Sequence, residues 1–199
     1  MKLLLHLTFL LLLPHALFGA NFRYYRFTPN ELRNTAEANS VQLAEFELYA
    51  NTNLLVGAIA SNLGGDSPGN ESPAQAVDGD LGTKWLDFTR FTGLVLDFGT
   101  PVFSDGYRFA TANDDSKRDP VSWTLEGSND NLTWSQIDSR SFANVPTTRQ
   151  TFTETFNFTT DSFTFFADPP SIIIGGSTTL SWEVDDATEV SIDQGIGSV

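Results

Sequence analysis

Cysteine is absent from this 199-residue chain, and its only two histidines, His6 and His15, lie near the N-terminus. A chain without thiols forms no disulfide and offers no cysteine nucleophile. If the N-terminal segment is removed as a leader, no imidazole remains either. Ser-His-Asp and Cys-His catalysis and zinc sites built on His or Cys are then excluded. Proton transfer would depend on carboxylates, Lys and Tyr.

Basic residues are also scarce: 11 Lys and Arg stand against 25 Asp and Glu, which gives a formal charge of −14. Such a surface repels phosphate backbones and anionic lipid headgroups. We therefore expect no nucleic-acid partner and no simple electrostatic binding to membranes. Neutral glycans and divalent cations remain compatible with this charge, and solubility alone is the alternative explanation for it.

Residues 1–20 carry one positive charge, Lys2, then a leucine-rich apolar run and a small-residue ending, Gly19-Ala20. This pattern predicts a secretory signal peptide cleaved near Ala20, and hence a secreted or cell-surface protein. A transmembrane helix is the alternative. The run is broken by Pro14 and His15 and falls short of the ~20 apolar residues that span a bilayer, so we expect no transmembrane segment in the mature chain.

After the leader, no long helical period occurs, and short segments rich in β-branched and aromatic residues alternate with Gly, Pro, Asn and Asp clusters. This is typical of an antiparallel β-sandwich. Strands are predicted at 22–27, 41–49, 94–98, 106–110, 122–126, 134–137 and 150–158. The nearly all-apolar segment 94–98 is predicted to be buried on both faces. Trp123 and Trp134 flank a predicted turn and are expected in the core.

Residues 161–199 differ from the preceding part. Their pattern resembles the opening strands of a bacterial immunoglobulin-like repeat, with Trp182 as its core residue. A sandwich of that class needs roughly 100 residues, so we expect an incomplete immunoglobulin-like domain and further domains of a longer polypeptide. The predicted organisation is a leader at 1–20, a β-sandwich at 21–160 and this partial unit at 161–199.

The loop that follows Val77 concentrates oxygen ligands. Asp78, Asp80 and Thr83 lie within six residues, with Gly79 and Gly82 allowing tight backbone turns. Oxygen ligands at this density suit a hard cation such as Ca²⁺. The spacing is not that of an EF-hand, and an ordinary Asp-Gly turn is the alternative.

The motif Asp-Gly-x-x-x-Thr-x-Trp at 78–85, the apolar strand at 94–98 and the segment 122–130 together resemble the discoidin, or coagulation factor 5/8 type C, domain. The resemblance covers most of residues 21–160 and implies a jelly-roll β-sandwich of the galactose-binding-like group. That family usually closes with a strand pair that here matches residues 22–27 and 41–48. A circular permutation accounts for this order, since sandwich termini often lie close together; an unrelated strand pair is the alternative.

The resemblance also implies a calcium site. The Glu45 carboxylate and the Ala44 carbonyl would join Asp78, Asp80, Thr83 and the carbonyl of Gln75 around one cation. Carboxylates buried together need such a counter-charge. We expect this calcium to be structural.

In the family, ligands bind where loops gather at one end of the sandwich. The polar candidates here are Asn113, Asp114, Asp115, Lys117, Arg118 and Asp119. Trp85 and Phe88 are the candidate stacking platforms for a sugar ring, whose apolar C–H face an aromatic side chain covers. The alternative is a self-bonded loop that only connects strands.

These features favour a non-catalytic carbohydrate-binding or adhesive module that recognises a glycan or another extracellular ligand. A structural spacer or scaffold of a surface protein is one alternative. An accessory module of a glycoside hydrolase, with its catalytic domain outside this chain, is another. A carboxylate glycosidase would need a carboxyl pair at defined separation, and 25 acidic residues make chance proximity uninformative.

Overall fold

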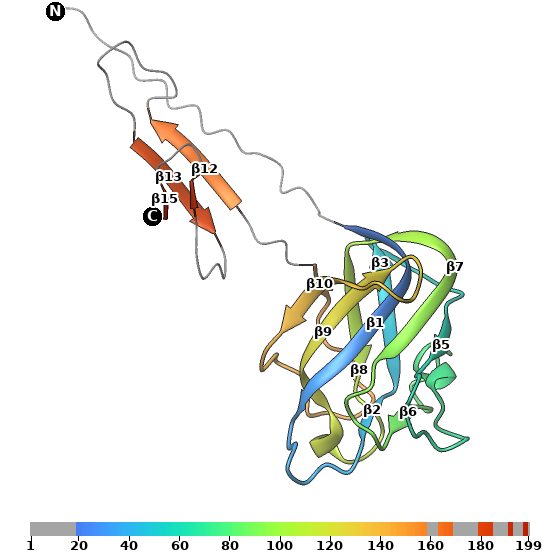
Figure 1. The fold of residues 1–199 in the computed structure, drawn as a ribbon. Coiled ribbons are helices and arrows are strands. Elements are labelled where there is room, and N and C mark those ends of the chain that lie inside the picture. The colour runs from blue at the N-terminus through green and yellow to red at the C-terminus, as the bar shows by residue number, and fades with distance from the viewer. Residues whose placement is uncertain (1–18, 159–162, 169–178, 185–190, 193–196, 199) are drawn as a thin grey trace, which may run out of the picture.

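The computed structural model describes residues 19–158, 163–168, 179–184, 191–192 and 197–198 (Figure 1). The predicted leader lies almost entirely outside these residues and stays a prediction. Within the described part, regular structure consists of strands and two short 3-10 turns, η1 (Pro73–Ala76) and η2 (Ser116–Arg118), so the all-β prediction is confirmed. No helix in this part is long and apolar enough to cross a membrane.

Eleven strands form the main body. They are β1 (Ala20–Leu32), β2 (Val41–Leu43), β3 (Glu45–Ala50), β4 (Asn53–Leu54), β5 (Ile59–Ser61), β6 (Trp85–Asp87), β7 (Leu94–Ser104), β8 (Gly106–Ala110), β9 (Pro120–Ser128), β10 (Ser135–Arg140) and β11 (Phe156–Asn157). A five-stranded sheet has the order β10-β9-β1-β7-β5 and a four-stranded sheet the order β11-β8-β3-β4, while β2 pairs with β6. All these pairings are antiparallel.

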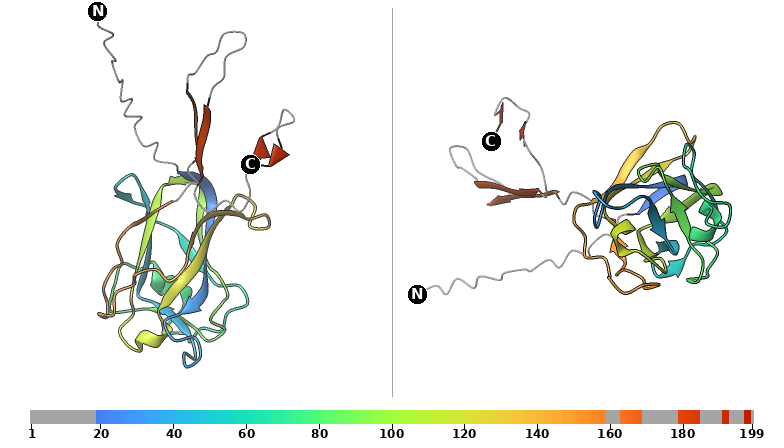
Figure 2. Two further views of the ribbon diagram at one scale, coloured as in Figure 1. Left: turned by 90° about the vertical axis from the view of Figure 1, so that its left-hand side faces the viewer. Right: turned by 90° about the horizontal axis from the view of Figure 1, so that it is seen from below.

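The two sheets face each other as layers around an aromatic core (Figure 2). Phe27 on β1 packs against Phe46 on β3, with ring centroids 5.1 Å apart, and against Trp123 on β9 at 5.6 Å. Trp123 also donates a 2.6 Å hydrogen bond to the hydroxyl of Tyr107 on β8. Because large aromatic side chains bury much apolar area, this cluster explains how a chain without disulfides holds two sheets together.

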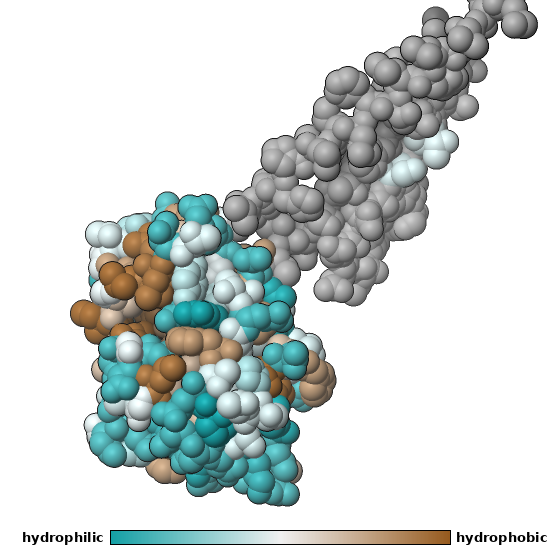
Figure 3. Space-filling view, turned by 180° about the vertical axis from the view of Figure 1, so that it is seen from behind, coloured by the Kyte–Doolittle hydropathy of each residue, from teal (hydrophilic) through white to brown (hydrophobic). Residues whose placement is uncertain are grey.

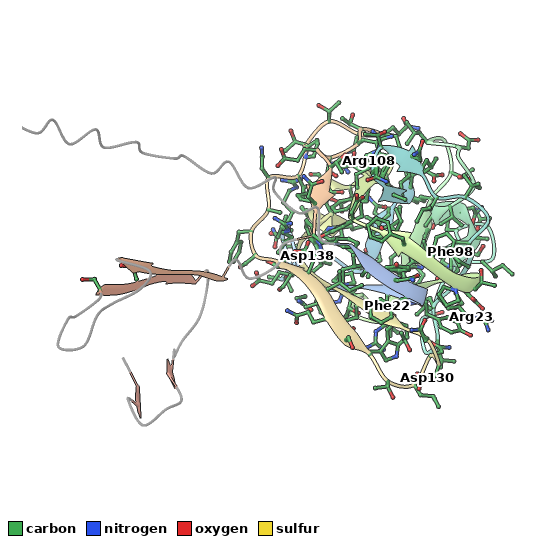
Figure 4. The ribbon with its side chains drawn as sticks, turned by 90° about the horizontal axis from the view of Figure 1, so that it is seen from above. Phe22, Arg23, Phe98, Arg108, Asp130 and Asp138 are labelled. Carbon is green, nitrogen blue, oxygen red and sulfur yellow. The ribbon has the colours of Figure 1, made fainter. Side chains whose placement is uncertain are left out.

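The outer faces of the sheets carry paired charges. Arg23 on β1 bonds Asp97 on β7 at 2.8 Å, and Arg108 on β8 bonds Glu47 on β3 at 2.6 Å. Figure 4 shows Arg23 and Arg108 on opposite sides of the sandwich. Each arginine is therefore a cross-strand link on solvent-facing sheet surface, which fixes which face of each strand points outward.

Most predicted strands are present, and 106–110 has the bounds of β8. The predicted strand 41–49 is instead interrupted at Ala44, which lies between β2 and β3. The predicted strand 150–158 is reduced to β11 and an isolated bridge at Phe152. The short strands β4, β5 and β6 were not predicted.

Two burial predictions were wrong. β7 is buried on one face only, because Leu94 and Leu96 point into the core whereas Val95 and Asp97 are partly exposed. Trp123 is fully buried as expected, but Trp134 lies outside the core with the Arg26 guanidinium 4.1 Å from its ring centroid. An outer cation–π contact of this kind satisfies an aromatic ring without burial between the sheets.

In the C-terminal part, β12 (Phe163–Asp168) pairs antiparallel with β13 (Thr179–Val184), and β14 (Ser191–Ile192) with β15 (Gly197–Ser198). The predicted core residue of the immunoglobulin-like unit, Trp182, belongs to β13, and its side chain lies outside what the structure describes. The immunoglobulin-like assignment therefore stays a prediction.

Candidate functional site

The loop 78–83 is held together by its own side chains. Asp78 accepts hydrogen bonds from the backbone N–H of Asp80 at 2.9 Å and from the Thr83 hydroxyl at 2.8 Å. Asp80 accepts one from the N–H of Gly82 at 2.7 Å. Two glycines make this turn possible: Gly79 has φ +79°, and a Cβ on Gly82 would lie 2.9 Å from the Asp80 carboxylate. The local sequence therefore dictates a compact turn.

Glu45 joins this loop from β3. Its Oε1 accepts hydrogen bonds from the backbone N–H groups of Gly79 at 2.8 Å and Asp80 at 3.1 Å, and the side chain is only 3 % exposed. Burial, followed by the contact with the Asp78 carboxylate, raises the pKa of Glu45 to about 7. Burial alone would raise the pKa of Asp78 too, but hydrogen bonds from Asp80, Thr83 and Glu45 lower it overall. The carboxyl groups of Glu45 and Asp78 are thus in direct contact.

The predicted calcium ligands are brought together only in part. Glu45 and Asp78 are in contact, and Thr83 is bonded to Asp78. The carboxylate of Asp80 bonds the N–H of Gly82, and no hydrogen bond between the described residues places the backbone carbonyl of Gln75 beside the Glu45–Asp78 pair. Ala44 is fully buried. Within the described residues, no three acidic, His or Cys side chains gather into a ready metal cage. The carboxyl pair fits a hard cation chemically, since it needs a proton or a counter-charge.

A second group of polar residues gathers at one end of the sandwich, where four loops meet. Arg90 donates to the carbonyls of Thr35 and Ala38, and the N–H of Asn34 donates to the carbonyl of Lys117. These bonds join the loops 33–40, 88–93 and 111–119, and Arg33 adds the fourth loop, 143–151, through the carbonyls of Val145 and Pro146. The loop end expected to bind ligands is therefore a continuous surface.

Asp114 and Arg118, two of the predicted polar site residues at this end, are bonded to each other and to neighbouring side chains. Lys84, 6 % exposed, donates to Asp114 at 2.9 Å and to Gln42 at 3.1 Å. Arg118 bonds Asn39 at 3.0 Å and Asp114 at 3.4 Å. Burial would raise the pKa of Asp114, but the hydrogen bond and charge of Lys84, together with Gln42 and Arg118, lower it overall. Asp114 is thus held as a carboxylate between two cations.

Asp119 is buried and is bonded to arginines from two other loops. It is fully buried and takes a bidentate pair of hydrogen bonds from Arg149, at 2.8 and 2.5 Å, with Arg33 3.3 Å away. The hydrogen bond to Asp119 raises the pKa of Arg149. A carboxylate so enclosed ties loops together and offers no free oxygen at the surface. Among the other candidates, Asn113, Asp115 and Lys117 are exposed.

The two aromatic candidates, Trp85 and Phe88, differ in burial. Trp85 is fully buried and packs in the core, so its ring presents no face to a ligand and the predicted platform role does not suit it. Phe88, three residues further, is 45 % exposed. Alternation of side chains along a strand does not account for this difference, because β6 ends at Asp87 and Phe88 belongs to the loop that follows.

The loop 88–92 contains functional candidates that the sequence analysis missed. Asp87 is fully buried and accepts hydrogen bonds from Thr89, Thr92 and the N–H of Asp66. Burial would raise the pKa of Asp87, but these hydrogen bonds lower it overall. The loop so fixed also exposes Phe91, with the Arg90 guanidinium 5.3 Å from its ring. In the sequence, this loop could have been found from the two Phe-Thr pairs that follow Asp87, at 88–89 and 91–92.

Comparison with known families decides the identity of this fold. The sequence model of the F5/8 type C domain matches residues 58–165, which is more than half of the chain. The chain belongs to the F5/8 type C domain family. Searches of curated proteins and of solved structures found no match. The F5/8 type C domain is a jelly-roll β-sandwich and typically a non-catalytic module that binds carbohydrates or other ligands, in agreement with the all-β fold described above.

Proposed function

We propose that this chain is an exported, non-catalytic binding module whose loop end recognises a glycan or another extracellular ligand. The observation that carries the proposal is the pair of exposed rings, Phe88 and Phe91, on a loop anchored by the buried Asp87. A rigid loop that presents aromatic surface beside polar groups is what sugar recognition needs. Asn113 and Arg118 of the loop 111–119 are the polar candidates, and Arg118 bonds Asn39 in the same loop 33–40 that Arg90 contacts.

We also propose that the domain is circularly permuted. The family match begins at Ala58, after β1 to β4. Nevertheless β1 lies in the middle of the five-stranded sheet, between β9 and β7, and β3 pairs with β8. β7, β8 and β9 all lie within the matched range, so strands that precede it complete both sheets. This arrangement supports the proposal that the N-terminal strands β1 and β3 occupy the positions of the strand pair that usually closes the family's domain.

A structural calcium ion belongs to the same proposal. Glu45 and Asp78 would hold it, and Asp80, Thr83 and the carbonyls of Gln75 and Ala44 are the further oxygen ligands that the resemblance implies. The support is the contact between two carboxyl groups with a raised pKa at Glu45. A divalent cation there would neutralise both groups and tie β3 to the loop.

The binding proposal is tested with the full chain on a glycan array, with Phe88→Ala and Arg118→Ala as site variants. Leu132→Ala is the matched control, because Leu132 is an exposed apolar residue in the loop that joins β9 to β10, away from loop 88–92. We expect the site variants to lose binding and the control to keep it. No binding across a broad panel would overturn the glycan proposal, and hydrolysis of any glycan would overturn the non-catalytic one.

One observation favours a second candidate. Asp114, Arg118 and Asp119 are bonded within the protein, as a connecting loop would be. If no glycan on the array binds, the result would therefore support a spacer or scaffold role, alone or as an accessory module of a larger hydrolase.

A further inference from the structure

One long stretch of the chain carries no charge. Between Glu47 and Asp66 every residue is uncharged, although 18 % of the residues in the chain are Asp, Glu, Lys or Arg. The stretch contains β4 and β5, each of which is the last strand in the order of its sheet. The connection between them, residues 55–58, therefore runs from one layer of the sandwich to the other along one side of the molecule. We call this connection the strap.

The large side chains of this stretch are aliphatic and exposed. Val56 is 78 % exposed, Ile59 74 % and Leu63 94 %, and Leu54 is 45 % exposed. In the view from behind, apolar side chains gather on the side of the molecule that carries β5 (Figure 3). Single exposed apolar residues are ordinary, whereas a group of them marks an interaction surface. We refer to residues 54–63 as the aliphatic side.

A hollow adjoins the aliphatic side. A cavity of about 200 Å³ is lined by residues 54–58, and the buried side chains of Leu48 and Leu96 also belong to its lining. The carboxylates of Glu45 and Asp78 line it too, but they belong to the proposed calcium site and take no part in this inference. The part of the cavity next to the strap is therefore aliphatic.

Val56 projects from the strap beside this hollow. The next residue, Gly57, has φ +88°, so the chain turns sharply there. A Cβ built on Gly57 would meet no other atom within 4 Å, which shows that the turn faces open space. In a two-fold interface the same patch serves both partners, so that residue i of one copy contacts residue j of the other and the reverse. An exposed projection next to an apolar hollow fits that requirement.

We infer that the aliphatic side binds a second copy of this chain in a two-fold dimer, with Val56 of each copy in the cavity of the other and Leu54 and Ile59 packed around it. Charge favours a second copy at this face. Each chain has a formal charge of −14, so two copies repel where their acidic surfaces meet, whereas the uncharged stretch brings few like charges together. A basic partner would find its counter-charge on the acidic surfaces and not here. Burial of the exposed aliphatic side chains drives the contact.

A dimer of this kind would carry two copies of the loop end. Two linked binding sites hold a densely coated glycan surface more tightly than one site does, without any new contact to the sugar. This consequence rests on the proposed function. The dimer itself does not, because the experiments below contain no glycan, and EDTA in the buffer keeps the proposed calcium site out of the comparison.

The test is sedimentation equilibrium of the full chain from about 5 µM to about 1 mM, since small interfaces associate weakly. The weight-average mass should rise from that of one chain toward twice that value and stop there. Because like charges oppose the contact, raising NaCl from about 20 mM to about 500 mM should tighten association by about threefold or more. A mass that stays at one chain, growth beyond two chains, or weaker association at high salt overturns the inference.

Variants locate the contact. Val56→Asp should abolish the dimer, and Ile59→Asp serves as the second site variant if the first does not fold, as a melting curve shows. Leu132→Asp is the matched control, because it adds the same charge at an 85 % exposed residue in the loop that joins β9 to β10, outside the aliphatic side. The control should dimerise as the parent protein does. Association that persists in both site variants, or equal loss in the control, overturns the inference.

Amide chemical shifts show which residues make the contact. Between dilute and concentrated samples, the largest changes in the ¹H–¹⁵N spectrum should fall at residues 54–63 and at the cavity residues 77–79. These changes should disappear in Val56→Asp. Changes concentrated in loop 88–92 or in β9 and β10 would place self-association on another surface and overturn the inference.

Discussion

Glu45 accepts a 2.8 Å hydrogen bond from the backbone N–H of Gly79, 34 positions further along the chain. The contact joins the middle of the four-stranded sheet to the loop that contains the family motif. Because the Asp78 carboxylate lies beside the same group, the conformation of this loop depends on what neutralises the pair. A proton and a divalent cation are the two possibilities, and they predict different behaviour in solution.

If calcium neutralises the pair, it should raise the melting temperature of the full chain relative to the same protein in EDTA, because an ion that binds only the folded state stabilises it. Asp78→Ala should abolish the difference. Asp66→Asn, which removes an exposed carboxylate elsewhere, should retain it. Identical melting curves with calcium and with chelator, read by differential scanning calorimetry, would rule out the metal site.

If a proton neutralises the pair, stability in EDTA should fall as pH rises. The pKa of Glu45 is about 7 in the folded state against an ordinary 4.5, so the folded state holds the proton more tightly. The stabilisation is fully present below about pH 4.5 and is lost as pH rises through about 7, on the order of 3 kcal/mol at 1.36 kcal/mol per pKa unit.

The matched variant for this prediction is Glu45→Gln, which keeps the shape of the protonated carboxyl but cannot titrate. Urea unfolding at pH 5 and pH 8 should show a smaller decrease for the variant than for the parent protein. Equal decreases in the two proteins would mean that another group controls the pH dependence.

The predictions from the sequence were most successful where one local pattern dominates. Alternating apolar residues at 106–110 and 122–126 gave strands in both sheets, and the Asp-Gly pattern gave a turn at 78–83. Burial of a side chain depends on distant partners, however. Trp134 has the same strand-flanking pattern as Trp123, but Arg26 from another strand holds it on the outer face. The strands β4 to β6 are two or three residues long and carry no readable period.

The candidate site, like the fold, could be predicted from the sequence only in part. Glu45 and Asp78 meet, as the family resemblance implies. The charged loop 111–119 could not be judged from sequence, because whether Asp114 and Arg118 are free depends on Lys84 and Asn39 from other loops. Trp85 and Phe88 differ in burial because the strand ends between them, and strand ends are the least predictable feature.

Asp87 should control the loop that presents Phe88 and Phe91. Asp87→Ala removes the acceptor for the N–H groups of Asp66 and Thr89 and for the Thr89 and Thr92 hydroxyls. Buried donors without partners cost about 1–3 kcal/mol each, and since the loop can turn some of them to water, we expect a total loss of about 2–4 kcal/mol.

The measurements for Asp87→Ala are urea unfolding and amide hydrogen exchange. Exchange should accelerate at residues 88–92 more than in β1 or β9, since the core strands do not touch Asp87. Phe88→Ala is the control, because it removes an exposed ring and should leave both stability and exchange nearly unchanged. Uniform acceleration across the protein would show that Asp87 supports the whole fold and not this loop.

Two buried tryptophans provide the last comparison. Trp123 donates a 2.6 Å hydrogen bond to Tyr107, whereas the indole N–H of Trp85 has no hydrogen-bond partner in the described part of the chain. Both side chains are fully buried. Replacing each by Phe removes the same atoms, so the lost packing is similar, but only Trp123→Phe also breaks a hydrogen bond. We expect Trp123→Phe to destabilise the protein by about 1–2 kcal/mol more than Trp85→Phe.

Chemical unfolding of the two variants gives this difference directly, and Tyr107→Phe completes the cycle. If the hydrogen bond is responsible, Trp123→Phe should cost less in the Tyr107→Phe background than in the parent protein, because the partner is already gone. Trp85→Phe should cost the same in both backgrounds. A Trp123→Phe cost that does not depend on Tyr107 would assign the effect to packing alone, which would leave the aromatic cluster, and not its polar link, as the element that joins β8 to β9.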